Sequence, residues 1–139
     1  MTLKLLPVPT VNARETRVLW MPYLVEISTR GQASLDEMER MVLSGEAQVH
    51  LAWDMEANAA RALAGTVIEP SARGGLVCHL VWCTGDRMAE WVDLVDDIAK
   101  WAKEHIGCVA MKATARPGWS KFLRPKGYRI SHVVLERGL

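Results

Sequence analysis

The chain has 139 residues and a formal net charge of +1, and half of its residues are hydrophobic. This length is sufficient for one domain with a proper core. A nearly neutral chain without a clustered basic face argues against an electrostatic nucleic-acid binder. No apolar run approaches the length of a membrane span, and the first residues lack the pattern of a signal peptide. We therefore expect one domain over residues 1–139, located in the cytoplasm.

The N-terminal part of the chain predicts a strand followed by a helix. Residues 2–9 can form a short strand, which Pro9 closes. Asn12 and Glu15 have the spacing of a capping box, which predicts a helix that starts near residue 13. Pro22 falls inside this helical pattern, so either the helix kinks there or its regular part begins there.

A second helix and three strands are expected next. Ser34 and Glu37 form a clearer capping box, and Gly45 supplies the stop for this helix. Alternating hydrophobicity and intervening turn residues then predict three antiparallel strands. These strands cover residues 47–55, 61–69 and 76–83. The third is apolar on both faces, so we expect it to be central in the sheet.

One long helix is predicted over about residues 87–105. Its apolar residues recur at helical spacing and form a broad stripe, whereas its charged residues lie largely away from that stripe. Asp86 has the chemistry of an N-cap, and Gly107 that of a C-terminal stop. A helix between the strand over 76–83 and the strand that follows implies one parallel pair in an otherwise antiparallel sheet.

The C-terminal thirty residues form a compact strand–helix–turn–strand pattern. Residues 109–114 are a β-like run, and residues 119–124 can make less than two helical turns before Pro125. Gly127 and its aromatic neighbour then start a last strand over residues 128–135, in which side chains alternate between two faces. The complete order is β-α-α-β-β-β-α-β-α-β, an α/β (α+β) chain with about six strands and helices on both faces of the sheet.

Three cysteines and six tryptophans stand out in the composition. Cys78 and Cys83 lie five residues apart on one expected strand, so we expect them on opposite faces, where they cannot share a metal or a disulfide. Free thiols and no metal site follow from this reading. The tryptophans either form a Trp-rich core or leave one or two indoles on the surface as interface anchors.

This element order resembles the GNAT fold of N-acetyltransferases over essentially the whole chain. In that family acyl-coenzyme A lies in a wedge between two diverging strands, and its pyrophosphate rests on a loop with the pattern Gln/Arg-x-x-Gly-x-Gly/Ala before the long helix. The corresponding segment here is 83–90, which retains Gly85 but lacks the second glycine. Asp86 and Glu90 would repel a pyrophosphate, and Arg87 compensates only in part.

The residues that the resemblance implies for catalysis are also altered. Family members often carry a tyrosine as general acid four residues before the glycine of the C-terminal turn, and that position here is Leu123. Tyr128 occupies the aromatic position, where packing is the usual role. The candidates for a general base are His79, His50 and Glu69, although a lone histidine on an apolar strand more often serves as a hydrogen-bonded core residue.

Three short segments resemble small phage and prophage proteins with a GNAT-like fold. They are residues 51–54, residues 116–119 and the Gly-Tyr-Arg turn with the Val-Val-Leu-Glu segment that follows it. The resemblance implies a non-catalytic virion or assembly component that needs no cofactor and contacts other phage structural proteins or itself. Such a protein would lie in the host cytoplasm or in the virion.

The alternative is an active N-acetyltransferase that uses acetyl-coenzyme A on an amine. In that case Gly85, Arg87 and Lys121 are the candidate cofactor-binding residues, and Arg116 and Arg124 could also contact phosphates. The other reading of these cations is a solvated basic helix face.

Overall fold

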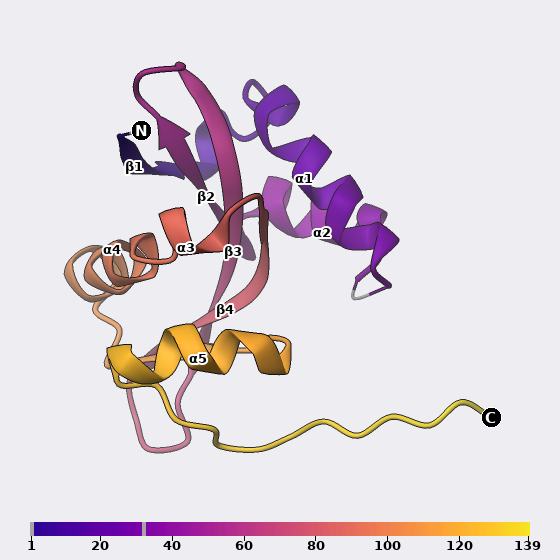
Figure 1. Cartoon of the computed structure of the whole chain (residues 1–139), viewed down its shortest axis with the longest axis vertical. Coiled ribbons are helices and arrows are strands. Elements are labelled where there is room, and N and C mark those ends of the chain that lie inside the picture. The colour runs from indigo at the N-terminus through magenta and orange to yellow at the C-terminus, as the bar shows by residue number, and fades with distance from the viewer. Residues whose placement is uncertain (1, 32) are drawn as a thin grey trace.

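A five-stranded mixed sheet forms the centre of the protein in a computed structural model that describes residues 2–31 and 33–139 (Figure 1). The strands are β1 (Leu3–Val8), β2 (Ala47–Asp54), β3 (Ala59–Pro70), β4 (Leu76–Gly85) and β5 (Ala110–Ala113), and they lie in this order across the sheet. Neighbouring strands are antiparallel except β4 and β5, which are parallel. The predicted meander and its single parallel pair are confirmed.

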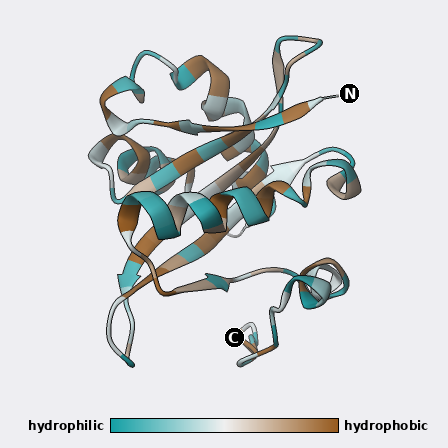
Figure 2. Cartoon of the chain, turned by 90° about the vertical axis from the view of Figure 1, so that its left-hand side faces the viewer, coloured by the Kyte–Doolittle hydropathy of each residue, from teal (hydrophilic) through white to brown (hydrophobic). Residues whose placement is uncertain are grey.

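Helices cover both faces of this sheet (Figure 1). Helices α1 (Arg17–Thr29) and α2 (Leu35–Ser44) pack on one face, and α3 (Met88–Trp91) and α4 (Leu94–Trp101) pack on the other. The α4 face is turned toward the viewer in Figure 2, where hydrophobic colour is concentrated in the strands beneath the helix. Among the described residues, no helix has both the length and the apolar character needed to cross a membrane.

The caps of the first two helices differ in how well the sequence predicted them. The Glu37 backbone N–H donates to Ser34 Oγ at 3.4 Å, so Ser34 is confirmed as the N-cap of α2, whereas the Glu37 carboxylate pairs with Arg40 instead of completing the box. The first capping box is wrong: a 3-10 turn, η1 (Thr10–Asn12), occupies its start, and α1 begins only at Arg17. Pro22 lies inside α1, which therefore continues through it.

The predicted long helix over 87–105 is divided in the structure. After α3, the chain turns at Val92 and Asp93 before α4, and a π-helical segment, η2 (Ala102–Ile106), completes the connection to Gly107. Asp86 does not cap α3, because the N-cap residue is Arg87, in the left-handed conformation with φ 55° and without a side-chain capping bond. The apolar stripe predicted which face is buried, but it carried no signal for the break.

A β-bulge in β4 changes which way its side chains face. Thr66 pairs with Leu80 and Gly65 pairs with Trp82, so Val81 is an extra residue without a partner on β3. The alternation of side chains is therefore reversed beyond Val81, and Trp82 joins the core on the α1 side. Cys78 lies on the α4 side before the bulge.

The same bulge corrects the expectation that Cys78 and Cys83 lie on opposite faces. Both pack in the apolar layer beneath α4, because the extra residue restores Cys83 to the face of Cys78. All three cysteines are free thiols, and among the described residues no group of three or more potential ligands could hold a metal ion. Burial raises the pKa of the Cys78 thiol to about 11.

The C-terminal arm contains the predicted short helix but not the last strand. Its helical part comprises η3 (Pro117–Trp119), α5 (Ser120–Leu123) and η4 (Arg124–Lys126), and Gly127 ends it with φ 91°. The expected strand over 128–135 is wrong for this conformation: residues 127–139 have no regular structure and extend away from the body (Figure 1). A strand needs a neighbouring strand for its backbone groups, and in the described part of the chain no backbone–backbone hydrogen bond involves residues 129–139.

The tryptophans belong to the interior. Trp20, Trp82 and Trp91 are buried, and the other three are partly buried. The partly buried indoles are those of Trp53, Trp101 and Trp119, so the alternative of one or two interface anchors at the surface stays a prediction. The Trp-rich core is confirmed.

Candidate functional site

The most informative site is the wedge where β4 and β5 separate. The two strands pair only from Val77 to Leu80 and from Ala110 to Ala113. Beyond these residues, β4 continues to Gly85, whereas the segment after β5 turns into the C-terminal arm. The wedge between them is lined by Leu80, Val81, Trp82, Cys83, Thr114, Ala115, Arg116 and Trp119.

The wedge is nearly closed in this conformation. The volume that a water molecule can enter is about 20 Å³, which is the room that one water needs. The indole of Trp82 lies directly on Gly65, where any Cβ would overlap with the ring. Trp119, on the opposite wall, packs against Trp91 with ring centroids 5.7 Å apart. Both aromatic side chains are therefore held by the core on either side of the wedge.

Two of the predicted site residues meet at the base of the wedge. The His79 imidazole has its Nδ1 atom 2.8 Å from Glu69 Oε1 and its Nε2 atom 2.6 Å from Thr114 Oγ1. His79 is on β4, Glu69 is on the adjacent strand β3, and Thr114 follows β5. Lys112 Nζ lies 3.8 Å from the other oxygen of Glu69. The structure thus brings His79 and Glu69 together and adds Thr114.

The hydrogen-bond partners assign a tautomer to the neutral imidazole. An ionised Glu69 can only accept, so His79 carries its proton on Nδ1 and donates it to that carboxylate. Nε2 then accepts from the Thr114 hydroxyl. A carboxylate that orients an imidazole, whose second nitrogen faces a hydroxyl, is the arrangement of a general base. The sequence did not indicate Thr114, because only the register of β4 with β5 places it beside His79.

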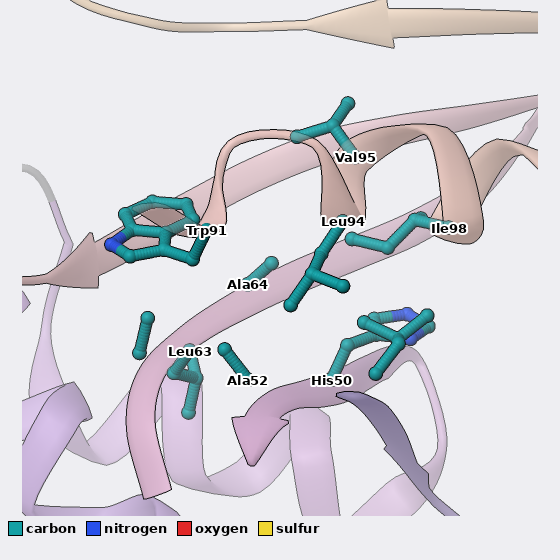
Figure 3. A pocket seen from close by; sticks show the side chains of 10 residues that line it. His50, Ala52, Leu63, Ala64, Trp91, Leu94, Val95 and Ile98 are labelled. Atoms are coloured by element: carbon teal, nitrogen blue, oxygen red, sulfur yellow. The ribbon is translucent and has the colours of Figure 1, made fainter. Parts of the chain in front are cut away.

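His50 lies in a different place. It is buried on β2 and lines a small apolar cavity beneath α3 and α4, which shares no residue with the wedge (Figure 3). Thr66 Oγ1 donates its proton to Gln48 Oε1. The same hydroxyl oxygen therefore accepts from His50 Nε2–H at 2.9 Å. Nδ1 of His50 has no hydrogen-bond partner within the described structure. Burial lowers the pKa of His50 to about 4, so this side chain is a neutral core residue at pH 7.

Tyr128 is also separate from the wedge. The half-buried side chain lies beside the N-terminal turn of α4, and its backbone N–H donates to the Leu123 carbonyl oxygen. Burial and then the Asp96 carboxylate raise the pKa of the phenol to about 12. Leu123 itself is buried, as packing predicts for that position.

The start of α3 shows poor chemistry for an anion. Helix α3 has only four residues, and Arg87 Nη1 lies 3.5 Å from Glu90 Oε1. Gly85 serves β3 rather than a ligand, because a Cβ there would overlap with Ala62. The Asp86 carbonyl oxygen accepts from Trp91 Nε1 at 2.9 Å. Gly85 and Arg87, which the sequence predicted to bind the cofactor, therefore contact neighbouring residues of the chain.

The basic residues of the arm are spread over different surfaces. Arg116 lines the wedge, whereas Lys121 Nζ lies 5.0 Å above the ring of Phe122 and Arg124 is exposed in η4. Lys126 was not singled out from the sequence, yet it fixes the arm. Its Nζ donates to Asp93 Oδ1 at 2.7 Å and to Asp96 Oδ2 at 2.8 Å. Because these cations lie apart, they do not form one phosphate-binding group.

Comparison with solved structures places this arrangement in a known fold. A ribosomal-protein-alanine N-acetyltransferase from Brucella melitensis biovar Abortus 2308 matches with a TM-score of 0.69 and 15% identity, over 99% of this chain and 100% of the other. The chain has the GNAT acetyltransferase fold. A predicted acetyltransferase with acetyl-CoA from Clostridium acetobutylicum matches with a TM-score of 0.68 and 11% identity, over 99% and 96% of the two chains.

A further match confirms that the similarity extends over the whole chain. An acetyltransferase from Trypanosoma brucei has a TM-score of 0.66 and 14% identity, over 99% of this chain and 100% of the other. No family model and no curated protein matches the sequence. Because these identities are low, the similarity establishes the GNAT fold and leaves the activity to the residues of the site.

The residues of this chain do not fit acetyl-CoA in the present conformation. A pyrophosphate at the start of α3 would meet the carboxylates of Asp86 and Glu90 and only one cation, Arg87, which is already beside Glu90. The part of the wedge between these side chains has room for about one water, which is less than a pantetheine arm occupies. The cofactor candidates Gly85, Arg87 and Lys121 remain predictions, as do the catalytic candidates His79, Glu69 and Tyr128.

Proposed function

We propose that the chain is a non-catalytic protein with the GNAT fold, which acts through protein–protein contacts as a component of a phage particle or of its assembly. The observation that carries this proposal is the nearly closed wedge, where about 20 Å³ is open to water. An acyl-CoA binder needs a cleft along the diverging strands and donors for two phosphates. Here the cleft has an open volume of only about 20 Å³. The loop where the phosphates would lie carries the carboxylates of Asp86 and Glu90.

The elements around the wedge support a scaffold in a further way. Lys126 ties the arm to α4 through two carboxylates, and Trp119 ties it to α3 through Trp91. Both contacts fix the arm, which supplies Arg116 and Trp119 to the lining of the wedge. A rigid arm of this kind presents a constant surface to a partner, which lowers the entropic cost of association.

The identity of the partner is inferred from sequence. The segment over 116–119 and the turn at Gly127, which resemble phage and prophage proteins, lie in the arm that lines the wedge. The third segment, 51–54, is the end of β2. Because the arm carries two of the three resembling segments, we propose that other phage structural proteins recognise it.

Acyl transfer to an amine is the second candidate, and one observation favours it. His79 is oriented by Glu69 at 2.8 Å and has its other nitrogen toward the wedge, where it could take a proton from an amine. In this reading Thr114 holds the place of the substrate nitrogen. The candidate requires the wedge to open.

Titration with acetyl-CoA distinguishes the two candidates. A ligand present at a thousand times its Kd stabilises the fold by about 4 kcal/mol, so millimolar acetyl-CoA would raise Tm clearly if the affinity were micromolar. We expect no rise beyond that caused by ATP at the same concentration, which controls for the charge of the phosphates. A rise specific to acetyl-CoA, abolished by Arg116→Gln, would overturn the proposal in favour of acyl transfer.

The assembly role has its own test. The chain should be present in purified particles or assembly intermediates when the genome that encodes it produces phage, as measured by mass spectrometry at constant stoichiometry to the major capsid protein. Neighbouring genes for portal or tail proteins would support the same role. Absence from both particles and intermediates would count against it, whatever the outcome of the titration.

A further inference from the structure

The C-terminal tail, residues 127–139, has the sequence of a strand but lies unpaired. Its alternating pattern predicts β structure from residue 128 to residue 135, and four of its apolar side chains are largely in water. The exposed fractions are 60% for Ile130, 71% for Val133, 74% for Val134 and 89% for Leu135. In the described part of the chain, no backbone–backbone hydrogen bond involves residues 129–139.

The open edge of the sheet matches this tail. Strand β5 is the last in the sheet order, so one of its sides has no neighbouring strand. The Thr114 N–H donates to the Leu80 carbonyl oxygen, so by the alternation of a parallel ladder the N–H groups of Met111 and Ala113 point to the open side. Val109 is 68% exposed beside this edge, and Ile106 is 37% exposed. An edge with unpaired donors and apolar side chains is a template for strand addition.

The base of the tail is fixed, and this determines where the tail can reach. Lys126 is held by two carboxylates of the Asp93–Asp96 turn, and the Tyr128 N–H is bonded to the Leu123 carbonyl oxygen. From this base the tail extends past the rest of the molecule (Figure 1), and no strand of the described residues follows β5 in the sheet. The eleven residues after Tyr128 can span about 36 Å when extended, enough to reach a neighbouring molecule.

We propose that residues 129–135 add as a sixth strand to the β5 edge of a second copy of this chain. Two copies that exchange tails in this way form a closed dimer with two-fold symmetry, because each supplies one tail and one edge. The exchange pairs the donors of β5 and covers the apolar side chains of both the tail and the edge. This inference goes beyond the proposed function, because the exchange holds whether or not acetyl-CoA binds and whichever phage protein is the partner.

Light scattering after gel filtration tests the exchange with two complementary variants. The full chain should have about twice its monomer mass of 15.5 kDa. Ala113→Pro removes an outward N–H from an edge strand, where proline is tolerated, and should give a monomer. Ala113→Ser keeps that N–H and a small side chain and should remain a dimer. A chain truncated after Arg129 should also be a monomer.

Mixing separates exchange from simple loss of folding. The Ala113→Pro chain has a tail but no usable edge, and the truncated chain has an edge but no tail. Together they should form a one-to-one heterodimer, which neither forms alone, and circular dichroism should show both to be folded. A monomeric full chain would overturn the proposal, as would a dimer that survives either variant or two folded variants that fail to associate.

Discussion

The indole ring of Trp82 lies against the backbone of Gly65, so closely that a Cβ at residue 65 would overlap with the ring. The bulge at Val81 causes this contact, because it turns Trp82 toward the α1 side of the sheet. Glycine is thus required at residue 65 because the indole ring occupies the space of a Cβ, and not because of the backbone angles there. The relationship couples the packing of β3 to one wall of the wedge.

Substitution of Gly65 by alanine tests this contact. The added methyl must displace a buried indole, so we expect Gly65→Ala to lower the free energy of unfolding by about 1–3 kcal/mol. Urea unfolding measures the change. Gly118→Ala is the matched control, since a Cβ at Gly118 meets no atom within 4 Å. Equal effects of the two substitutions would contradict the contact.

Acidification should destabilise the fold through His50. Its pKa is about 4 in the folded chain and about 6.5 when unfolded, so between these values the unfolded state binds more protons. The stability contribution is complete above pH 6.5 and is lost as the pH falls to 4, by an amount of about 3 kcal/mol. Urea unfolding from pH 7 to pH 4 measures the slope.

His50→Leu separates this histidine from the carboxylates that also titrate in acid. The variant should lose the part of the slope between pH 6.5 and 4, whereas His105→Gln, at an exposed position, should retain it. A slope that is identical in wild type and His50→Leu would show that His50 is not the group responsible.

The tautomer of His79 can be observed directly. Because Glu69 accepts from Nδ1, nitrogen NMR of the neutral imidazole should show the proton on Nδ1 and an unprotonated Nε2 that accepts from Thr114. Thr114→Val removes the hydroxyl partner of Nε2, and since Thr114 is exposed, water can replace it at a cost below about 1 kcal/mol. Thr114→Ser should leave the spectrum unchanged. A proton found on Nε2 would reverse the assigned direction of both hydrogen bonds.

Lys126 should control the mobility of the arm. Two carboxylates raise the pKa of its ammonium, which therefore stays charged across the working range of pH. Lys126→Met removes both ion pairs, and we expect faster hydrogen exchange at the backbone amides of α5 and η4. Lys100→Met, at an exposed position on α4, should not change these rates. Exchange that is unaffected by Lys126→Met would show that packing alone holds the arm.

Local signals explain the parts of this fold that the sequence predicted. Strand alternation in residues 47–55 and the cap from Ser34 to Glu37 depend on groups a few residues apart. The same holds for Gly127, whose left-handed conformation ends the arm. Such features are determined by neighbouring side chains and backbone groups, so they can be read without knowledge of the tertiary structure.

The parts that the sequence did not predict depend on residues far apart in the chain. No residue type marks the bulge at Val81 in the sequence. The bulge nevertheless decides the orientation of Trp82 and brings Cys83 to the face of Cys78. The break at Val92 is likewise unmarked within the apolar stripe.

The site follows the same division. The sequence by itself determined the GNAT-like order of elements and named His79 and Glu69 as candidates, because residue type and periodicity are local properties. Only the tertiary structure decided that these two side chains meet Thr114, which is 35 residues from His79. It also decided that the wedge is nearly closed and that the last strand lacks a partner within its own chain. Strand register, close packing and edge pairing are properties of the assembled sheet.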